Sequence, residues 1–271
     1  MQYLMSQRRS RLSLTFLFTV MMVLESPALS APARNEIPQQ GGIWNSRVPE
    51  WTFAPSEHQR LVESLRRITG LKQLGFNLDG SLVMGEMATP EGGSRLARAM
   101  LTFALESGAV FIIEDHSGSA SVQFGQLDQG TNYQNNITGW RAVIWRVRID
   151  PTDFRQIHAP RSVKASFDEG FTVMHEILHG LGYDDPREPG AVGECEELLN
   201  EVRLELGLPL RAEYFGTFFP IASGLATIRL RFQRKTDDLR RTRWRDDYLF
   251  FTVSPETSPE SLFSCRSRSS Y

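Results

Sequence analysis

Hydrophobic periodicity divides this chain into helix-type and strand-type segments. Apolar residues recur every three or four positions over 56–70 and 93–108, the spacing of helices that bury one face. An apolar run over 109–115 predicts a buried strand, and the alternation of residue types over 143–150 predicts a half-buried one. Together these segments predict an α+β fold.

Weaker patterns extend this assignment. Residues 121–124 are expected to pair with the strand at 109–115 through a turn, and the composition of 126–139 predicts a loop. Two further strands are expected at 227–232 and 248–253, on either side of a charged connection. We interpret the Arg-rich segment between them as a solvated hairpin rather than a nucleic-acid site.

The N-terminus has the order of a secretory signal. Basic residues precede an uncharged apolar run at 12–24, and small residues follow it. That run is too short to span a bilayer, which needs about 20 residues. Ala28 and Ser30 suit the positions before a cleavage site at Ala31. The sequence therefore predicts a signal peptide over 1–30, a secreted or periplasmic location, and no stable membrane insertion after cleavage.

Composition sets the remaining domain boundaries. Pro, Gly, Gln and Ser are frequent in 31–55, which predicts a linker arm, and 256–271 is expected to be a disordered tail. The segment between them, 56–255, is expected to form one domain. The net charge of −2 provides no global field for nucleic acid. Whether Cys195 and Cys265 form a disulfide stays open, since a sequence gives no Cα spacing.

The strongest motif is HEILH, which contains His175, Glu176 and His179. Ser166 and Glu169 form a capping-box pattern ahead of it, so the motif is expected on a helix. Positions i and i+4 of a helix lie one turn apart, so both imidazoles can reach one metal ion. Glu176 points about 100° away from His175, where it can act as a general base on a zinc-activated water. The motif therefore predicts a zinc site.

A catalytic zinc site needs a third protein ligand, and two interpretations compete. In the first, the helix ends at Gly182 and Asp185 turns back toward the metal. In the second, a glutamate comes from the helix predicted at 193–207. The candidates off its apolar face are Glu194, Glu196, Glu197 and Glu201. For each of these glutamates, a solvated charge is the ordinary interpretation.

The stretch after the motif carries a family resemblance. Residues 200–214, NEVRLELGLPLRAEY, resemble a segment of bacterial effector and toxin zinc metallopeptidases with the pattern Asn-x-x-Arg-x-Glu-x-Gly-Leu-Pro-x-Arg-x-x-Tyr. The matching positions are Asn200, Arg203, Glu205, Gly207, Leu208, Pro209, Arg211 and Tyr214. The resemblance covers about 165–215. It implies a zincin-like metallopeptidase, with a small antiparallel or mixed sheet packed on an active-site helix and a following helix.

The resemblance also implies roles for further residues. The family has an acidic Glu-Glu-Leu element before the Asn, here Glu196–Leu198, which favours Glu197 or a neighbour as the third ligand beside the alternative Asp185. Arg211 and Tyr214 resemble the Arg-x-x-Tyr pair that stabilises the oxyanion in clostridial neurotoxin light chains. That role requires donors near the charge that develops on the attacked carbonyl.

Two functional hypotheses follow. In the first, the chain is a secreted zinc metalloendopeptidase in which the two histidines and an acidic ligand, Asp185 or Glu197, hold Zn²⁺ and Glu176 is the general base. Its partner is a protein or peptide substrate, and an immunity or inhibitor protein is a further candidate. The strand at 143–150 is either the cleft edge that pairs with substrate or an ordinary sheet strand. In the second hypothesis, the chain is a non-catalytic secreted binding module whose structural metal site is closed by a fourth ligand.

Overall fold

A computed structural model describes residues 38, 40–85, 90–119, 121–221, 226–238 and 241–253. All of them belong to one compact unit, Arg34–Tyr271. The predicted signal peptide at 1–30, the predicted tail at 256–271 and Cys265 lie outside the described residues.

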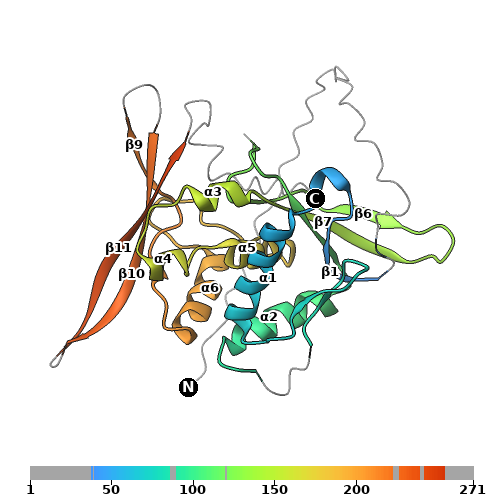
Figure 1. The fold of residues 1–271 in the computed structure, drawn as a ribbon, viewed down its shortest axis with the longest axis horizontal. Helices are drawn as coiled ribbons and strands as arrows, with labels where there is room; N and C mark the ends of the chain where they lie inside the picture. Colours follow the sequence, from blue (N-terminus) through green and yellow to red (C-terminus); the bar gives the residue numbers. More distant parts are fainter. Residues whose placement is uncertain are drawn as a thin grey trace, which may run out of the picture. The chain divides into compact units, whose positions relative to one another are not determined.

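Within the described residues, the chain between Gly42 and Ile149 contributes the strands of a five-stranded mixed sheet (Figure 1). Its strands are β1 (Gly42–Asn45), β4 (Val110–Asp115), β5 (Gly125–Leu127), β6 (Thr131–Gln134) and β7 (Arg141–Ile149). Strands β1, β4 and β7 are parallel neighbours in that order, and β5 and β6 pair antiparallel with the other side of β7. A small ribbon of β2 (Gly75–Phe76) and β3 (Leu82–Val83) precedes β4 in the chain.

The sheet decides between two alternatives for the strand at 143–150 and corrects two further expectations. β7 has neighbours on both sides, so the strand predicted at 143–150 is an interior strand and not the edge of a cleft. Residues 121–124 form no strand beside β4, and the loop predicted over 126–139 contains most of β5 and all of β6. These two strands are short and rich in polar residues. Their pairing with β7 outweighs a composition that predicts a loop.

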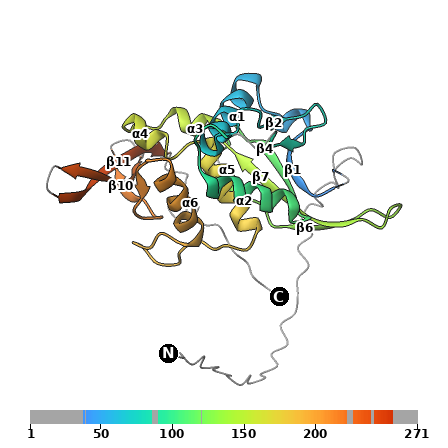
Figure 2. The same ribbon diagram turned by 90° about the horizontal axis from the view of Figure 1, so that it is seen from below.

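Helices bury the apolar faces that the periodicity predicted. The longer ones are α1 (Pro55–Thr69), α2 (Arg95–Glu106), α5 (Glu169–Gly180) and α6 (Glu194–Glu205), and the shorter ones are η1 (Pro49–Trp51), α3 (Pro151–Arg155) and α4 (Arg161–Lys164). The helices expected at 56–70 and 93–108 are confirmed as α1 and α2. Helix α5 lies against α1, α6, β5 and β7 (Figure 2). All of its residues from Glu169 to Leu178 are therefore buried.

The C-terminal part forms a second, antiparallel sheet. Its strands are β8 (Leu210–Arg211), β9 (Thr217–Pro220), β10 (Ala226–Asp238) and β11 (Arg241–Val253), in the order β11-β10-β8, with β9 also paired to β10. The strands expected at 227–232 and 248–253 are confirmed. They are longer than expected, because the charged connection between them continues the ladder. Apolar residues of the hairpin join a second core cluster: Ala226, Ile228, Leu230, Phe232, Leu249 and Phe251.

The fold class is mixed α+β, as the sequence predicted. The linker arm expected over 31–55 is wrong from Gly42 onward, because β1 and η1 lie within it. Ile43, 1% exposed, packs in the main core and explains why this segment is ordered against β4 despite its composition. Among the described residues, no helix has the length and apolar character needed to cross a membrane.

Candidate metal centre

Helix α5 carries the HEILH motif and is held by apolar contacts along one face. Phe171, Met174 and Leu178 are buried in the main core. The helix begins at Glu169, and its N-cap is Asp168, whose carboxylate accepts the Phe171 N–H at 3.2 Å. The capping box predicted at Ser166 is therefore wrong, since the Ser166 hydroxyl donates to the Ser162 carbonyl instead.

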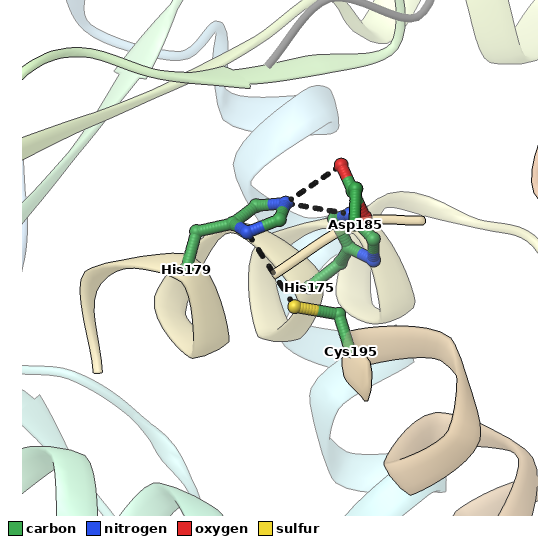
Figure 3. Close-up of side chains that lie close together, drawn as sticks. All are labelled: His175, His179, Asp185 and Cys195. Atoms are coloured by element: carbon green, nitrogen blue, oxygen red, sulfur yellow. Dashed lines mark hydrogen bonds and ion pairs between the residues drawn. The ribbon is translucent and has the colours of Figure 1, made fainter. Parts of the chain in front are cut away.

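Three donor groups converge at the end of this helix (Figure 3). The Nε2 atoms of His175 and His179 lie 3.0 Å apart. Asp185 Oδ1 lies 3.3 Å from His175 Nε2, and Asp185 Oδ2 lies 3.1 Å from His179 Nε2. Ligand atoms about 2.0–2.1 Å from a tetrahedral metal ion are about 3.3 Å from one another. The three side chains thus have the mutual spacing of a metal's first coordination shell.

The chemistry of these donors fits a cation. Within the part of the chain that is described, both Asp185 carboxylate oxygens are buried without a hydrogen-bond partner, a costly arrangement unless positive charge lies beside them. His179 Nδ1 lies 2.9 Å from the Tyr183 carbonyl oxygen. A proton on Nδ1 that bonds this carbonyl leaves the Nε2 lone pair facing Asp185 and His175.

Electrostatics at the centre favour bound positive charge. Burial lowers the pKa of His175, but the carboxylates of Asp185 and Glu196 outweigh burial and raise it to about 10. Burial alone would raise the pKa of Asp185, but the two imidazoles hold that pKa well below its usual value. A metal ion would replace the protons that the imidazoles otherwise retain, because metal ligation needs neutral imidazole and ionised carboxylate.

The two candidates for the third ligand lie in different surroundings. Asp185 follows Gly182, whose φ of 97° turns the chain back at the end of the helix. Glu197, in the first turn of α6, is exposed and is not part of the cluster. The geometry therefore brings Asp185, and not Glu197, to the two histidines.

Cys195 is a fourth group near the centre. Its buried sulfur lies 3.5 Å from His179 Nδ1 and 3.6 Å from the Tyr183 carbonyl. The four donor atoms of His175, His179, Asp185 and Cys195 all lie within 4.8 Å of one another. Burial and the surrounding carboxylates raise the pKa of the thiol well above its usual value. The sulfur approaches His179 Nδ1, whereas Asp185 approaches Nε2 on the other side of the same ring.

Glu196 supports the centre from behind His175. One of its oxygens lies 3.2 Å from His175 Nδ1 and 2.7 Å from the Arg211 guanidinium, and the other accepts from Arg203 at 2.6 Å. Glu196 is 2% exposed. Burial raises its pKa, yet Arg203, Arg211 and His175 together hold that pKa well below its usual value. The expectation of a solvated charge is therefore wrong for this glutamate.

A signal for this arrangement is present in the sequence. Glu196, Asn200 and Arg203 follow one another at i, i+4 and i+7 along α6, so they share one helix face. Asn200 Oδ1 accepts from Arg203 at 3.0 Å and from the Arg211 backbone N–H at 2.8 Å, which ties β8 to the helix. Asn200 and Arg203 of the Asn-x-x-Arg pattern thus belong to a buried polar network.

Glu176 is buried beside the histidines, next to strand β5. It is 4% exposed, and within the described residues its Oε2 atom has no hydrogen-bond partner. Burial raises the pKa of Glu176, against the opposing effect of both imidazoles. A Cβ on Gly125 would lie 2.3 Å from Thr172 Cγ2 and 3.2 Å from Glu176 Oε1, so this strand approaches α5 closely only because residue 125 is glycine.

Arg211 and Tyr214 lie beside the same centre. Besides Glu196, the Arg211 guanidinium donates to the carbonyls of Tyr214 at 2.7 Å and Glu213 at 3.2 Å. The Tyr214 ring stacks on His175, with ring centroids 5.9 Å apart and planes 18° apart. Arg211 therefore contacts Glu196, which supports the candidate metal centre, and Tyr214 contacts His175, which belongs to it.

The structure brings together most of the residues that the sequence singled out: His175, Glu176, His179, Asp185, Arg211 and Tyr214. Glu197 lies away from them. The buried cluster of His175, His179, Asp185 and Cys195 has the composition to hold a metal ion. Comparison with protein-family models, curated proteins and solved structures finds no significant match to this chain.

Proposed function

We propose that this chain is a zinc-dependent metallopeptidase with a zincin-like site. The observation that carries the proposal is the triangle of donors formed by His175, His179 and Asp185, with the Glu176 carboxylate buried beside it. A helix with two imidazoles and an adjacent glutamate is the arrangement that metal-dependent peptide hydrolysis uses. The resemblance of residues 200–214 to effector and toxin metallopeptidases supports the same proposal.

The donor set favours zinc among the common metals. Two imidazole nitrogens and one carboxylate oxygen suit Zn²⁺, whereas Ca²⁺ and Mg²⁺ prefer oxygen ligands alone. Three protein ligands leave one position open, as catalytic zinc sites require. Zinc bound there would supply Lewis acidity toward a water molecule and a peptide carbonyl.

The chain's own residues would move the protons. Glu176 accepts a proton from the attacking water and returns it to the leaving amine, and its burial raises its pKa toward the range useful for both transfers. Arg211 contacts Glu196 and the Tyr214 ring stacks on His175, so both residues help to hold the imidazole in place. The oxyanion role that the resemblance implies for this pair is also part of the proposal. The peptide substrate and the secreted location remain part of this proposal.

The direct test is Glu176→Gln. The amide keeps the size of the side chain but does not accept the proton, so zinc content should be unchanged and peptide hydrolysis should fall by at least about a hundredfold. Zinc is measured by elemental analysis of the purified protein, and hydrolysis with a mixed peptide library. Glu197→Gln, an exposed change on the next helix, is the matched control and should leave both quantities unchanged. Full hydrolysis by Glu176→Gln would refute the proposed role of this residue.

Cys195 motivates a second candidate function, a binding module with a structural metal. If Cys195 completed a shell with His175, His179 and Asp185, four protein ligands would close the site. Cobalt substitution separates the two functions, because a thiolate ligand gives an intense near-ultraviolet charge-transfer band. The peptidase proposal expects no such band and equal metal binding by Cys195→Ser. A band that Cys195→Ser abolishes, together with loss of metal, would favour the structural site.

A further inference from the structure

A cavity opens beside the candidate metal centre and encloses about 590 Å³ of space, its mouth included. His175 and Glu176 line one side of it. Its apolar lining comes from three separate parts of the chain: Phe124, Phe167, Phe171, Leu230 and Phe251. A substrate bond placed at Glu176 would therefore have a neighbouring side chain directed at this lining.

We propose that this cavity is the pocket that selects a large apolar side chain, aromatic above all, next to the cleaved bond. The inference rests on the proposed function and names the substrate class for that site. It makes Phe124, Phe167, Leu230 and Phe251 the residues that determine specificity.

The walls of the pocket are aromatic and mutually fixed. The Phe124 ring contacts the Phe167 ring at 5.0 Å and 81°, and the Phe251 ring at 4.7 Å and 87°. These are edge-to-face contacts, which a further aromatic ring inserted among them can extend. An apolar side chain that enters would also lose its contact with water, which favours binding in proportion to the area buried.

The charged part of the lining disfavours charged side chains of either sign. The carboxylates of Glu176 and Glu196 face an acidic side chain, and the guanidinium groups of Arg203 and Arg211 face a basic one. Both arginines already donate to Glu196. An acidic side chain would thus lose its hydration without gaining an unengaged guanidinium group, and a basic side chain would lose its hydration beside two buried groups of its own sign.

Backbone strain at one of the lining residues fits this assignment. Phe124 has a φ of 59°, a left-handed conformation that aromatic residues rarely adopt. Its N–H donates to Asp153 at 3.0 Å, and its carbonyl accepts the Asp150 N–H at 3.0 Å. Residues of α3 and the chain before it therefore hold the Phe124 ring against the cavity, and strain maintained in this way is typical of functional sites.

The first experiment measures cleavage preference. The zinc-loaded full chain is incubated with peptides that differ only at the two residues flanking one bond. We expect kcat/KM with Phe or Leu at one flanking position to exceed that with Ala, Asp or Lys by about tenfold or more. Cleavage that is indifferent to both flanking residues would overturn the inference and leave the proposed function standing.

Two leucines offer a matched pair of variants. Leu230 and Leu249 are cross-strand partners, 1% and 0% exposed in the same core cluster, but Leu230 lines the cavity and Leu249 does not. Leu230→Ala enlarges the pocket, so the ratio of kcat/KM for Trp to that for Phe should rise about fivefold. Leu249→Ala should leave the ratio within about twofold of its original value. Because the ratio does not depend on the fraction folded, an equal change in both variants would contradict the pocket assignment.

A binding measurement keeps the pocket testable if no peptide is cleaved. The probes are N-acetyl-phenylalanine amide and N-acetyl-alanine amide, titrated into the unmodified protein by calorimetry. The phenylalanine amide should bind at least about tenfold more tightly, and Leu249→Ala should retain that difference. Selective binding without hydrolysis would support the pocket and count against the peptidase. Equal binding of both amides would overturn the pocket.

Discussion

At the scale of single residues, the geometry separates ligands that the sequence left as alternatives. Asp185→Ala should abolish tight zinc binding, because it removes a carboxylate that lies 3.1–3.3 Å from both imidazoles. Glu197→Ala should leave zinc content unchanged, since Glu197 is exposed on α6. Zinc titration with a competing chelator measures both variants. Normal affinity in Asp185→Ala would remove this residue from the site.

Glu196 leads to a prediction about stability. It is the shared partner of the Arg203 and Arg211 guanidinium groups and lies beside His175. Glu196→Gln replaces a buried negative charge with a neutral amide and leaves the two arginines without compensation. Breaking such a buried pair costs about 3–5 kcal/mol of unfolding free energy.

Urea unfolding of metal-free protein measures this cost. The control is Glu197→Gln one position along the helix, where an exposed change should alter the unfolding free energy by less than about 0.5 kcal/mol. Comparable effects of the two variants would show that Glu196 is not the electrostatic centre of the network.

The sequence identified some of these residues and not others for a physical reason. His175, Glu176 and His179 are fixed relative to one another by helix geometry alone, so their spacing suffices. Asp185 depends on how the chain turns after Gly182, and Glu196 depends on which glutamates of α6 are buried. Both depend on tertiary structure, which the spacing of residues along the chain does not give. The four candidate glutamates of this helix look equivalent until their partners are known.

At the scale of elements, the approach of β5 to α5 positions Glu176. Gly125→Ala would place a methyl group 2.3 Å from Thr172 Cγ2, so β5 and α5 must move apart. Overpacking of this kind costs about 1–3 kcal/mol. Because Glu176 Oε1 is the next nearest atom, the proposed peptidase activity should fall more than stability alone explains.

A second glycine provides the control for this change. A Cβ on Gly75 would meet Arg66 at 3.6 Å, an ordinary van der Waals contact, so Gly75→Ala should be nearly neutral. Thermal unfolding and hydrolysis of one peptide at saturating zinc compare the two variants. Normal stability and activity in Gly125→Ala would mean that β5 does not constrain the general base.

Elements were predicted best where one face supplies the burial. The periodic stripes of α1, α2 and α5 correspond to the main core, so their positions followed from sequence. β5 and β6 are held by pairing with β7, and β1 by pairing with β4, contacts between residues distant in the chain. Composition predicts loops and linkers there because it reflects the polarity of the segment and contains no information about the strand with which it pairs.

At the scale of the whole molecule, the candidate centre lies where α5, α6 and the two sheets meet. Residues of α5 belong to the main core, whereas the cavity beside them is closed by Leu230 and Phe251 of the hairpin. The donors come from α5 and from the segment that connects it to α6, so they converge only when both helices are packed. Ligand convergence and global folding are therefore linked.

This linkage predicts that zinc stabilises the entire unit. A metal that binds only the folded state raises the unfolding free energy by about 2.7 kcal/mol at a hundredfold excess over its dissociation constant. Unfolding in zinc and in chelator should therefore differ, and Asp185→Ala should lose the difference, because two imidazoles alone bind the ion weakly. Glu176→Gln should keep the difference, since the role proposed for Glu176 is proton transfer and not metal binding. If Asp185→Ala and the unmodified chain gained equal stability from zinc, the ion would be bound elsewhere, and the triangle of His175, His179 and Asp185 would not be the metal site.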